Sequence, residues 1–182
     1  SEIQSVGEDI TQQVAAEEAG EAIRRGRRAL GTITRVVTRA PDAATLLEQA
    51  CHAIVQETGY EMAWVGLPVE DAERTFRIAA HGGDDHGYLA ELNVSWDAHR
   101  PEGQGPTARA FRTGRPVAVS QLQSDPLTRP WHGLAARAGM VAGAALPLWC
   151  QGQALGALSI YSTLPRAFGE EVYLHQTSVR GP

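Results

Sequence analysis

Apolar residues recur at helical spacing in the segment 43–58, the most regular pattern in the chain. Positions three and four apart share one face of a helix, so this segment has a single apolar side. The residues on that side are Leu46, Leu47, Ala50, Ile54 and Val55. Pro41 and Asp42 interrupt the chain before the segment, and Gly59 suits the left-handed residue that ends many helices. The pattern therefore predicts one amphipathic helix from Ala43 to Thr58.

A different period follows in the segment 61–69, where alternate residues belong to opposite faces. Met62 and Trp64 fall on one face, and Ala63 and Val65 fall on the other. Because side chains of a strand point alternately to its two sides, this segment is predicted to be a strand that is apolar on both faces.

Hairpins account for most of the remaining strands. The segment 74–80 is predicted to pair with the first strand across a polar turn. The segments 141–150 and 153–161 form a second predicted hairpin around a Gln-Gly turn, after a helix over 131–138. Strands joined in hairpins with helices to one side indicate an antiparallel α+β sheet rather than a βαβ fold.

The segment 103–119 contains the clearest residues for starting and ending a helix. Gly105 and Pro106 suit the start of a helix, because proline needs no N–H partner at the first helical position. Gly114 suits its left-handed end. Pro116 cannot continue the helix, so the β-branched residues after it are predicted to form a strand.

The segment 9–40 is predicted to be one long helix with a narrow apolar stripe. The stripe repeats every seven residues, as in a coiled coil. It contains Ala16, Ile23, Leu30 and Val37. Three glycines weaken the helix by about 1 kcal/mol each relative to alanine. We expect it to pair with a second copy of itself; the alternative is an ordinary solvated helix packed on its own domain.

Composition and charge exclude several classes of function. The net charge is −5 and no long basic run is present, so nucleic-acid binding has no electrostatic support. The sequence contains no run of 18 apolar residues, so no membrane span is predicted. Two isolated cysteines, Cys51 and Cys150, make neither a disulfide framework nor a metal cluster, which favours a cytoplasmic location.

The order of these elements resembles the GAF domain, a family of sensor domains. Four segments carry the resemblance, and their order follows that of the family. They are 60–66, 105–116, 124–131, and the pair 144–148 with 156–161. The resemblance implies an α+β fold with a six-stranded antiparallel sheet, helices on both sides, a ligand pocket on one face, and a dimer partner on the other.

Residues 7–11 resemble the exit of a PAS sensor domain, in which an Asp-Ile-Thr step opens a linker helix. We therefore expect residues 1–29 to be the end of a PAS domain with its linker helix, and residues 30–170 to be the GAF domain. Residues 171–182 are expected to be an atypical or truncated tail. The resemblance implies an output domain in the same parent chain, either a cyclic-di-GMP enzyme or a histidine kinase.

The candidate ligand-binding residues come from the segments expected to wall the pocket. A tryptophan or tyrosine combines a large apolar face with a polar group, which suits a small amphipathic ligand. The candidates are Trp64, His81, Tyr88, Trp96, Arg109, Trp131 and Tyr161. The alternative for the aromatic residues is that they simply fill the core, and for Arg109 that it lies on a solvated face.

No catalytic residue and no cofactor is assigned from the sequence. Cys51 falls on the apolar face of a predicted helix and Cys150 at the second hairpin turn, so neither is expected to be a nucleophile activated by a base. His81 is kept as a possible axial ligand of haem, because some GAF sensors hold that group; the other histidines are expected to be solvated. The expected function is a non-catalytic sensor that binds a small molecule and relays a signal through paired helices. The alternatives are a ligand-free dimerisation module and a haem-based gas or redox sensor.

Overall fold

The computed structural model describes residues 42–150 and 152–168. The predicted N-terminal helix, its heptad stripe, the PAS exit and the C-terminal tail lie outside the described residues. The described part begins with the helix α2 (Ala43–Thr58). The Asp42 carboxylate accepts a hydrogen bond of 2.9 Å from the Thr45 N–H, and Gly59 ends α2 with a φ of 73°. Both ends of α2 therefore lie where the sequence predicts them.

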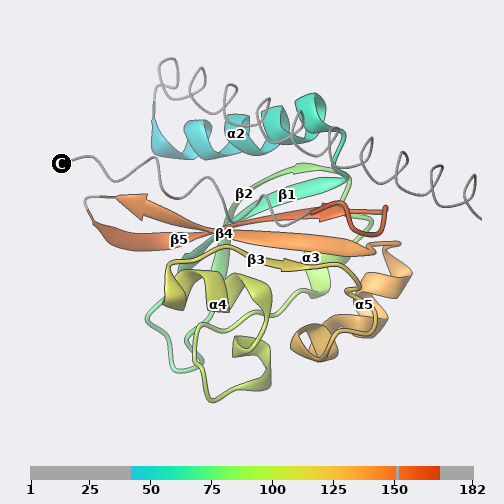
Figure 1. The fold of residues 1–182 in the computed structure, drawn as a ribbon. Coiled ribbons are helices and arrows are strands. Elements are labelled where there is room, and N and C mark those ends of the chain that lie inside the picture. Colours follow the sequence, from blue (N-terminus) through green and yellow to red (C-terminus); the bar gives the residue numbers. More distant parts are fainter. Residues whose placement is uncertain (1–41, 151, 169–182) are drawn as a thin grey trace, which may run out of the picture.

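The centre of the fold is an antiparallel sheet of five strands in the order β2-β1-β5-β4-β3 (Figure 1). Two hairpins supply four of these strands, as predicted, and β3 adds the edge next to β4. The strands are β1 (Met62–Pro68), β2 (Phe76–Gly83), β3 (Val117–Val119), β4 (Ala142–Cys150) and β5 (Gln153–Ser162).

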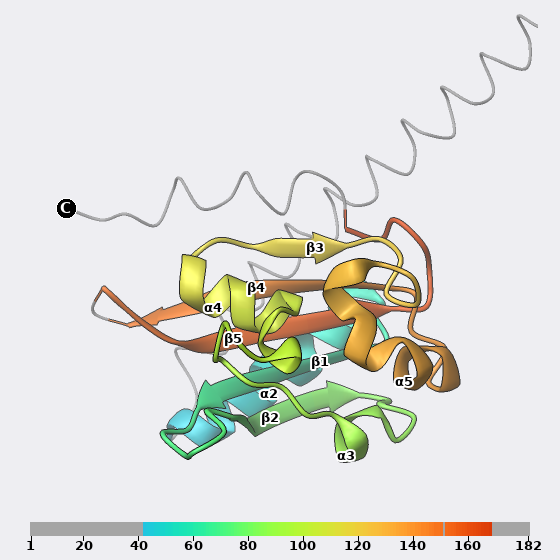
Figure 2. The same ribbon diagram turned by 90° about the horizontal axis from the view of Figure 1, so that it is seen from below.

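Short helices cover the face of the sheet opposite α2, as Figure 2 shows from below. The largest is α4, which starts after Gly105 and ends at Gly114, in agreement with the sequence prediction. The helical elements of this face are α3 (Tyr88–Glu91), η1 (Pro101–Gly103), α4 (Pro106–Thr113), η2 (Pro126–Trp131) and α5 (His132–Arg137). None of the helices in the described ranges has the length and hydrophobicity that a bilayer crossing requires.

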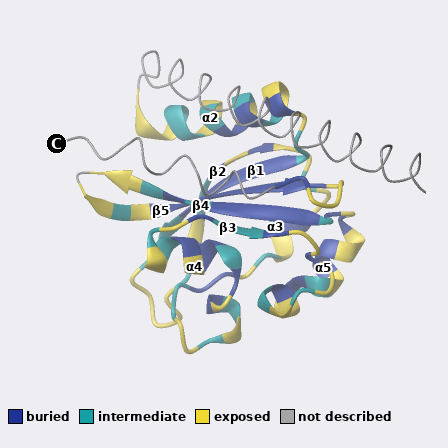
Figure 3. Cartoon of the chain, viewed as in Figure 1, coloured by how far each residue is buried: buried dark blue, intermediate teal, exposed yellow. Residues whose placement is uncertain are grey.

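The alternation in β1 divides the core into two layers, as predicted. Met62 and Trp64 belong to the layer beneath α4 and α5, whereas Ala63 and Val65 belong to the layer beneath α2. All four side chains are at most 2% exposed. Figure 3 shows the result as a dark, buried sheet between partly exposed helices. One strand therefore contacts both helical layers.

The sheet has five strands in the described part of the chain, whereas the resemblance implied six. Ser95 forms only an isolated antiparallel bridge with Thr75 at the edge of β2. The Ser95 hydroxyl donates to the carbonyl oxygens of Glu73 and Arg74 at 2.8 and 3.1 Å. Together with the backbone bonds from the Phe76 N–H to Val94 and from the Trp96 N–H to Arg74, these bonds hold the two segments side by side without a sixth strand in the described residues.

Candidate functional site

A small cavity lies between the first turn of α4 and the sheet. The volume available to the centre of a water molecule is about 20 Å³, which is room for about one or two waters. Its walls come from six segments far apart in the sequence. They are Tyr88, Leu92, Val94, Gly105, Pro106, Thr107, Leu122, Thr128, Trp131, Gly143, Ala144, Ala145, Ser159 and Tyr161. No charged side chain is among these lining residues.

The start of α4 forms one end of the cavity. Gly105 is the N-cap and supplies no side-chain hydrogen bond, and Pro106 has no N–H to offer. The first N–H groups of a helix lack an intrahelical acceptor, and Thr107, a residue of the cavity wall, carries one of them. The aligned peptide dipoles add a partial positive charge at this end. The site can therefore receive an electronegative atom from a ligand.

Hydroxyl groups from α4 and β5 meet in the cavity wall. Thr107 Oγ1 and Ser159 Oγ lie 2.9 Å apart, and both side chains are buried. This bond uses one of the two hydroxyl protons, so the other remains available as a donor. Sequence reasoning missed this pair, because a lone serine and a lone threonine have no characteristic spacing.

Two tyrosines form the other end of the cavity. The rings of Tyr88 and Tyr161 are 5.2 Å apart between centroids, and each side chain is at most 7% exposed. Burial is the main reason why the pKa of each hydroxyl is raised above its ordinary value. Both hydroxyls stay protonated at neutral pH, and the contact of the Tyr88 hydroxyl with that of Tyr161 leaves at most one of the two protons for a ligand.

Trp64 lies beside the tyrosine end with an unpaired donor. Its side chain is 1% exposed, and Nε1 is the one buried side-chain nitrogen or oxygen of the described residues that has no hydrogen-bond partner. Trp64 Nε1 lies near the Tyr161 hydroxyl and lowers the pKa of that hydroxyl against the larger effect of burial. The two groups do not have the geometry of a hydrogen bond. An unpaired buried donor costs about 1–3 kcal/mol, so a ligand that accepted from it would recover that stability.

Trp131 separates the cavity from an open groove. Its ring packs against Gly105, and its Nε1 donates to the Asn93 carbonyl oxygen at 3.0 Å. Trp131 also lines a groove of about 320 Å³, whose walls include Arg137 and Glu91, the partners of a 2.7 Å ion pair. Trp131 lines both spaces, so its displacement would connect the groove to the cavity.

Four of the seven predicted site residues gather at this cavity. Tyr88, Trp131 and Tyr161 line it, and Trp64 lies beside Tyr161. The alternative prediction, that these aromatic residues fill the core, also describes them, because all four belong to the same buried cluster. A ligand-binding role for them stays a prediction.

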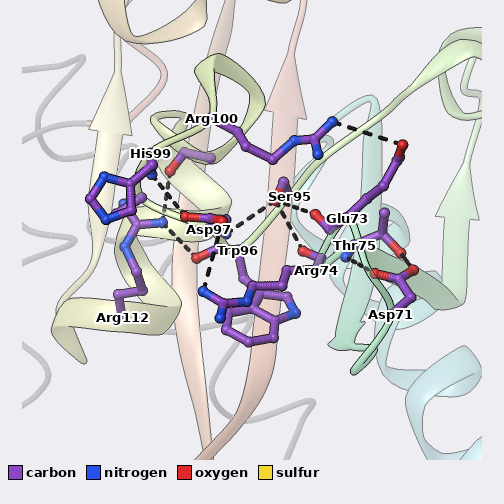
Figure 4. Close-up of polar contacts among 12 residues, drawn as sticks. Asp71, Glu73, Arg74, Thr75, Ser95, Trp96, Asp97, His99, Arg100 and Arg112 are labelled. Atoms are coloured by element: carbon purple, nitrogen blue, oxygen red, sulfur yellow. Dashed lines mark hydrogen bonds and ion pairs between the residues drawn. The ribbon is translucent and has the colours of Figure 1, made fainter.

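Trp96 does not line the cavity but holds two loops together (Figure 4). Its Nε1 donates to the Val69 carbonyl oxygen at 3.0 Å, and the Arg74 guanidinium lies 5.0 Å from its ring centroid. Arg112 adds hydrogen bonds to the carbonyl oxygens of Trp96 and Gly103. Trp96 thus fixes the loop that leads into α4 to the turn between β1 and β2.

His81 and Arg109 also lie away from the cavity. His81 is opposite Trp64 in the register, but β2 is an edge strand and its imidazole is exposed. Arg109 is exposed on the outer side of α4, in agreement with the alternative prediction of a solvated face. Sheet order decides the position of His81, and a single sequence does not reveal sheet order.

The residues around the cavity do not fit a haem group. No histidine lines it, and a haem needs an axial ligand and far more room than this cavity provides. Among the residues that the structure describes, no group of three or more histidine, cysteine or acidic side chains is arranged to hold a metal ion. The haem alternative therefore has no support in the described residues.

Residues 40–174 match the GAF_2 family model, which describes the GAF domain. The fold is also similar to three solved structures. Free methionine-R-sulfoxide reductase from Neisseria meningitidis has a TM-score of 0.64 at 18% identity, covering 84% of this chain and 81% of that one. The GAF domain of a phosphoenolpyruvate-protein phosphotransferase from Coxiella burnetii has a TM-score of 0.62 at 19% identity, covering 83% and 84%. The nlh2 GAF domain from A. aeolicus, in an inactive state, has a TM-score of 0.58 at 19% identity, covering 78% and 81%. No curated protein matches the sequence.

Proposed function

The chain belongs to the GAF domain family, and we propose that it is a non-catalytic sensory domain that binds a small molecule in the cavity at the start of α4. Binding there would shift the geometry of the helices on the other face of the sheet. Because β1 carries Trp64 on the cavity side and Val65 on the α2 side, it offers a direct physical link between the two faces.

The unpaired Nε1 of Trp64 is the observation that carries this proposal. Buried donors in folded proteins are almost always paired, so this orphan beside Tyr161, a residue of the cavity wall, supports a ligand as its partner. The free N–H groups of α4 and the buried hydroxyls surround the same small space. A core whose only task was packing would gain stability by replacing these donors with apolar groups.

A thermal-shift screen of small metabolites tests the proposal, together with native mass spectrometry of protein purified from its own host. A true ligand should raise the melting temperature of the wild type in a saturable way. The shift should fall in Trp64→Phe, which lacks the N–H, and persist in Trp149→Phe, whose exposed ring lies outside the cavity. No retained compound and no shift across the panel would contradict ligand sensing.

The rest of the proposal concerns the assembly. We propose that the N-terminal helix over residues 9–40 pairs with that of a second copy, downstream of a PAS domain and upstream of a cyclic-di-GMP or histidine-kinase output domain in the cytoplasm. Deleting residues 1–28 should give a monomer by light scattering, whereas an unchanged dimer would place the interface elsewhere.

A ligand-free dimerisation module is the second candidate, and the small volume of the cavity favours it. It predicts that Trp64→Ala lowers stability but leaves regulation of the output domain intact. The sensor predicts that this variant also loses regulation under conditions where it remains folded.

A cysteine-dependent reaction is not proposed. Cys51 is fully buried against the sheet, and burial raises the pKa of its thiol to about 12, so it is not a nucleophile. Cys150 is exposed at the end of β4 and does not line the cavity. The similarity to the sulfoxide reductase is a similarity of fold.

A further inference from the structure

His86 contacts two carboxylates at once in the connection between β2 and α3. Its Nε2 lies 3.0 Å from Glu61 Oε1, and its Nδ1 lies 3.3 Å from Asp84 Oδ1. An imidazole carries an N–H on both nitrogens only when it is protonated, and the neutral ring leaves one nitrogen as an acceptor. A neutral His86 would therefore turn a lone pair toward one of the two carboxylates. The pair of contacts is satisfied only by the protonated ring.

Glu61 joins this contact to the two tyrosines of the cavity wall. Its N–H donates to the Tyr161 carbonyl oxygen at 3.0 Å, and its own carbonyl oxygen accepts from the Asp84 N–H at 3.2 Å. Its carboxylate adds the contact with His86, which lies two residues before Tyr88. Tyr88 and Tyr161 both line the cavity, with ring centroids 5.2 Å apart. Glu61 therefore holds the segment before Tyr88 in place relative to Tyr161.

The chain between His86 and Tyr88 is short and tightly turned. His86 has a φ of 48° and Gly87 has a φ of 78°, so both lie in the left-handed region. A residue with a Cβ keeps this conformation only where its surroundings hold it there. The Tyr88 N–H bonds to the Asp85 carbonyl oxygen at 2.7 Å, so Tyr88 belongs to the same turn. A change at His86 therefore reaches Tyr88 across a single residue, Gly87.

From these contacts we propose that protonation of His86 fixes Tyr88 against Tyr161 in the cavity wall, and that loss of this proton lets Tyr88 move away and loosens the tyrosine end of the cavity. Histidine ordinarily titrates near neutrality, so the cavity responds to pH in that range. As a regulation of ligand binding, the inference rests on the proposed sensory function, whereas the movement of Tyr88 can be measured without a ligand.

The charges around His86 favour its protonated form. The charged groups that act on it are the carboxylates of Glu61, Asp84 and Asp85. The hydrogen bond with Glu61 is the main reason why the pKa of His86 is raised, and loss of hydration opposes it. The contact is therefore complete below the ordinary pKa of histidine and is lost as the pH rises through the higher pKa of the folded protein. Carboxylates ordinarily titrate near pH 4, so His86 is the group of this network that titrates near neutrality.

The test follows the two tyrosine rings in the full chain, labelled with ring-¹³C tyrosine, from about pH 5.5 to about pH 8.5. The nuclear Overhauser effect between the Tyr88 and Tyr161 rings is the deciding readout, because a nearby charge can shift a signal without moving a ring. Tyr88→Phe assigns the signals. We expect a strong effect at acidic pH that is lost with the same midpoint as the imidazole signals of His86. An effect that stays constant while His86 titrates would overturn the inference.

Variants show whether His86 is the responsible group. Asparagine carries no charge and tolerates a left-handed φ, so His86→Asn should have the weak ring contact at every pH. Glu61→Gln keeps the size of the side chain but removes its charge, so the midpoint should move to lower pH. His52→Gln, on an exposed position of α2, should behave as the wild type. A pH-dependent ring contact in His86→Asn would overturn the inference. None of these outcomes depends on a ligand, so the metabolite screen decides the sensory function separately.

Discussion

At the scale of single residues, Gly105 shows how a missing side chain shapes the site. Its φ of −68° is ordinary for any residue, so the backbone does not require glycine. A Cβ at this position would lie 2.5 Å from Cζ3 and 2.7 Å from Cη2 of Trp131. Glycine is therefore needed because the indole ring packs directly on the backbone where α4 begins.

We predict that Gly105→Ala destabilises the protein by about 1–3 kcal/mol, because the Trp131 ring must leave its position. Chemical denaturation measures the loss of stability. In ¹H–¹⁵N spectra, the Trp131 Nε1–H signal should move from the position that its hydrogen bond to the Asn93 carbonyl oxygen gives it. Gly133→Ala is the matched control. A Cβ there meets only Arg137 Nη1 at 3.7 Å, and alanine should stabilise α5 by about 0.5–1 kcal/mol. Equal behaviour of the two variants would contradict the close packing of Trp131.

A pH-dependent contact holds the connection between β2 and α3. His86 Nε2 lies 3.0 Å from Glu61 Oε1, and Nδ1 lies 3.3 Å from Asp84 Oδ1. The hydrogen bond with Glu61 is the main reason why the pKa of His86 is raised, and the charges of Asp84 and Asp85 add to it. The protonated imidazole thus ties the segment before Tyr88 to the start of β1.

We predict that this contact stabilises the fold below about pH 6.5, the ordinary pKa of histidine. A raised folded-state pKa means that the stabilisation is lost as the pH rises through that higher value. His86→Asn should remove this part of the pH dependence of the melting temperature, and asparagine tolerates the positive φ of 48°. His52→Gln, on an exposed position of α2, should keep it. An unchanged pH profile in His86→Asn would contradict the prediction.

At the scale of elements, α2 packs on β2 through their backbones. A Cβ on Gly82 would lie 2.5 Å from the His52 nitrogen and 2.6 Å from the Cys51 carbonyl carbon. Both are main-chain atoms that no rotamer change can move. The alternation in β1 predicts that a helix covers this face, but it does not reveal that glycine brings the helix into contact.

We predict that Gly82→Ala is the more damaging of the two core glycine substitutions and costs more than Gly105→Ala. An added methyl group must push the whole of α2 away from the sheet, whereas at Gly105 only a side chain has to move. Urea denaturation of the two variants and of Gly133→Ala gives the comparison. If Gly82→Ala proved as stable as the Gly133→Ala control, α2 would not pack as closely as described.

The elements were predictable from sequence where local chemistry decides them. The ends of α2 and α4 follow from caps, glycines and a proline, and the alternation in β1 follows from its side chains. Long-range placement was not predictable. Trp96 belongs to a predicted pocket segment, but Arg74 and the Val69 carbonyl hold it outside the cavity. The Thr107–Ser159 bond joins positions 52 residues apart, which no local pattern reports.

At the scale of the whole molecule, the sheet separates the side that holds the cavity from the side that α2 covers, and the proposed sensory function requires the two sides to be coupled. The cavity lies under α4, whereas α2 covers Cys51 on the opposite face. Cys51 is 0% exposed, so a thiol reagent reaches it only after α2 separates from the sheet. Labelling of Cys51 therefore measures opening on the side away from the cavity.

We predict that a compound that raises the melting temperature in the metabolite screen also slows Cys51 labelling in a Cys150→Ser variant, because α2 and the cavity share β1 and open together. Binding to the closed state alone lowers the open population by the factor 1 + [L]/Kd, so about 100-fold slower labelling is expected at 100 times Kd. Trp64→Phe should lose the effect, and labelling in denaturing urea should be insensitive to the compound. If the compound binds but the labelling rate does not change, α2 opens independently of the cavity, and a signal does not pass through the sheet in this way.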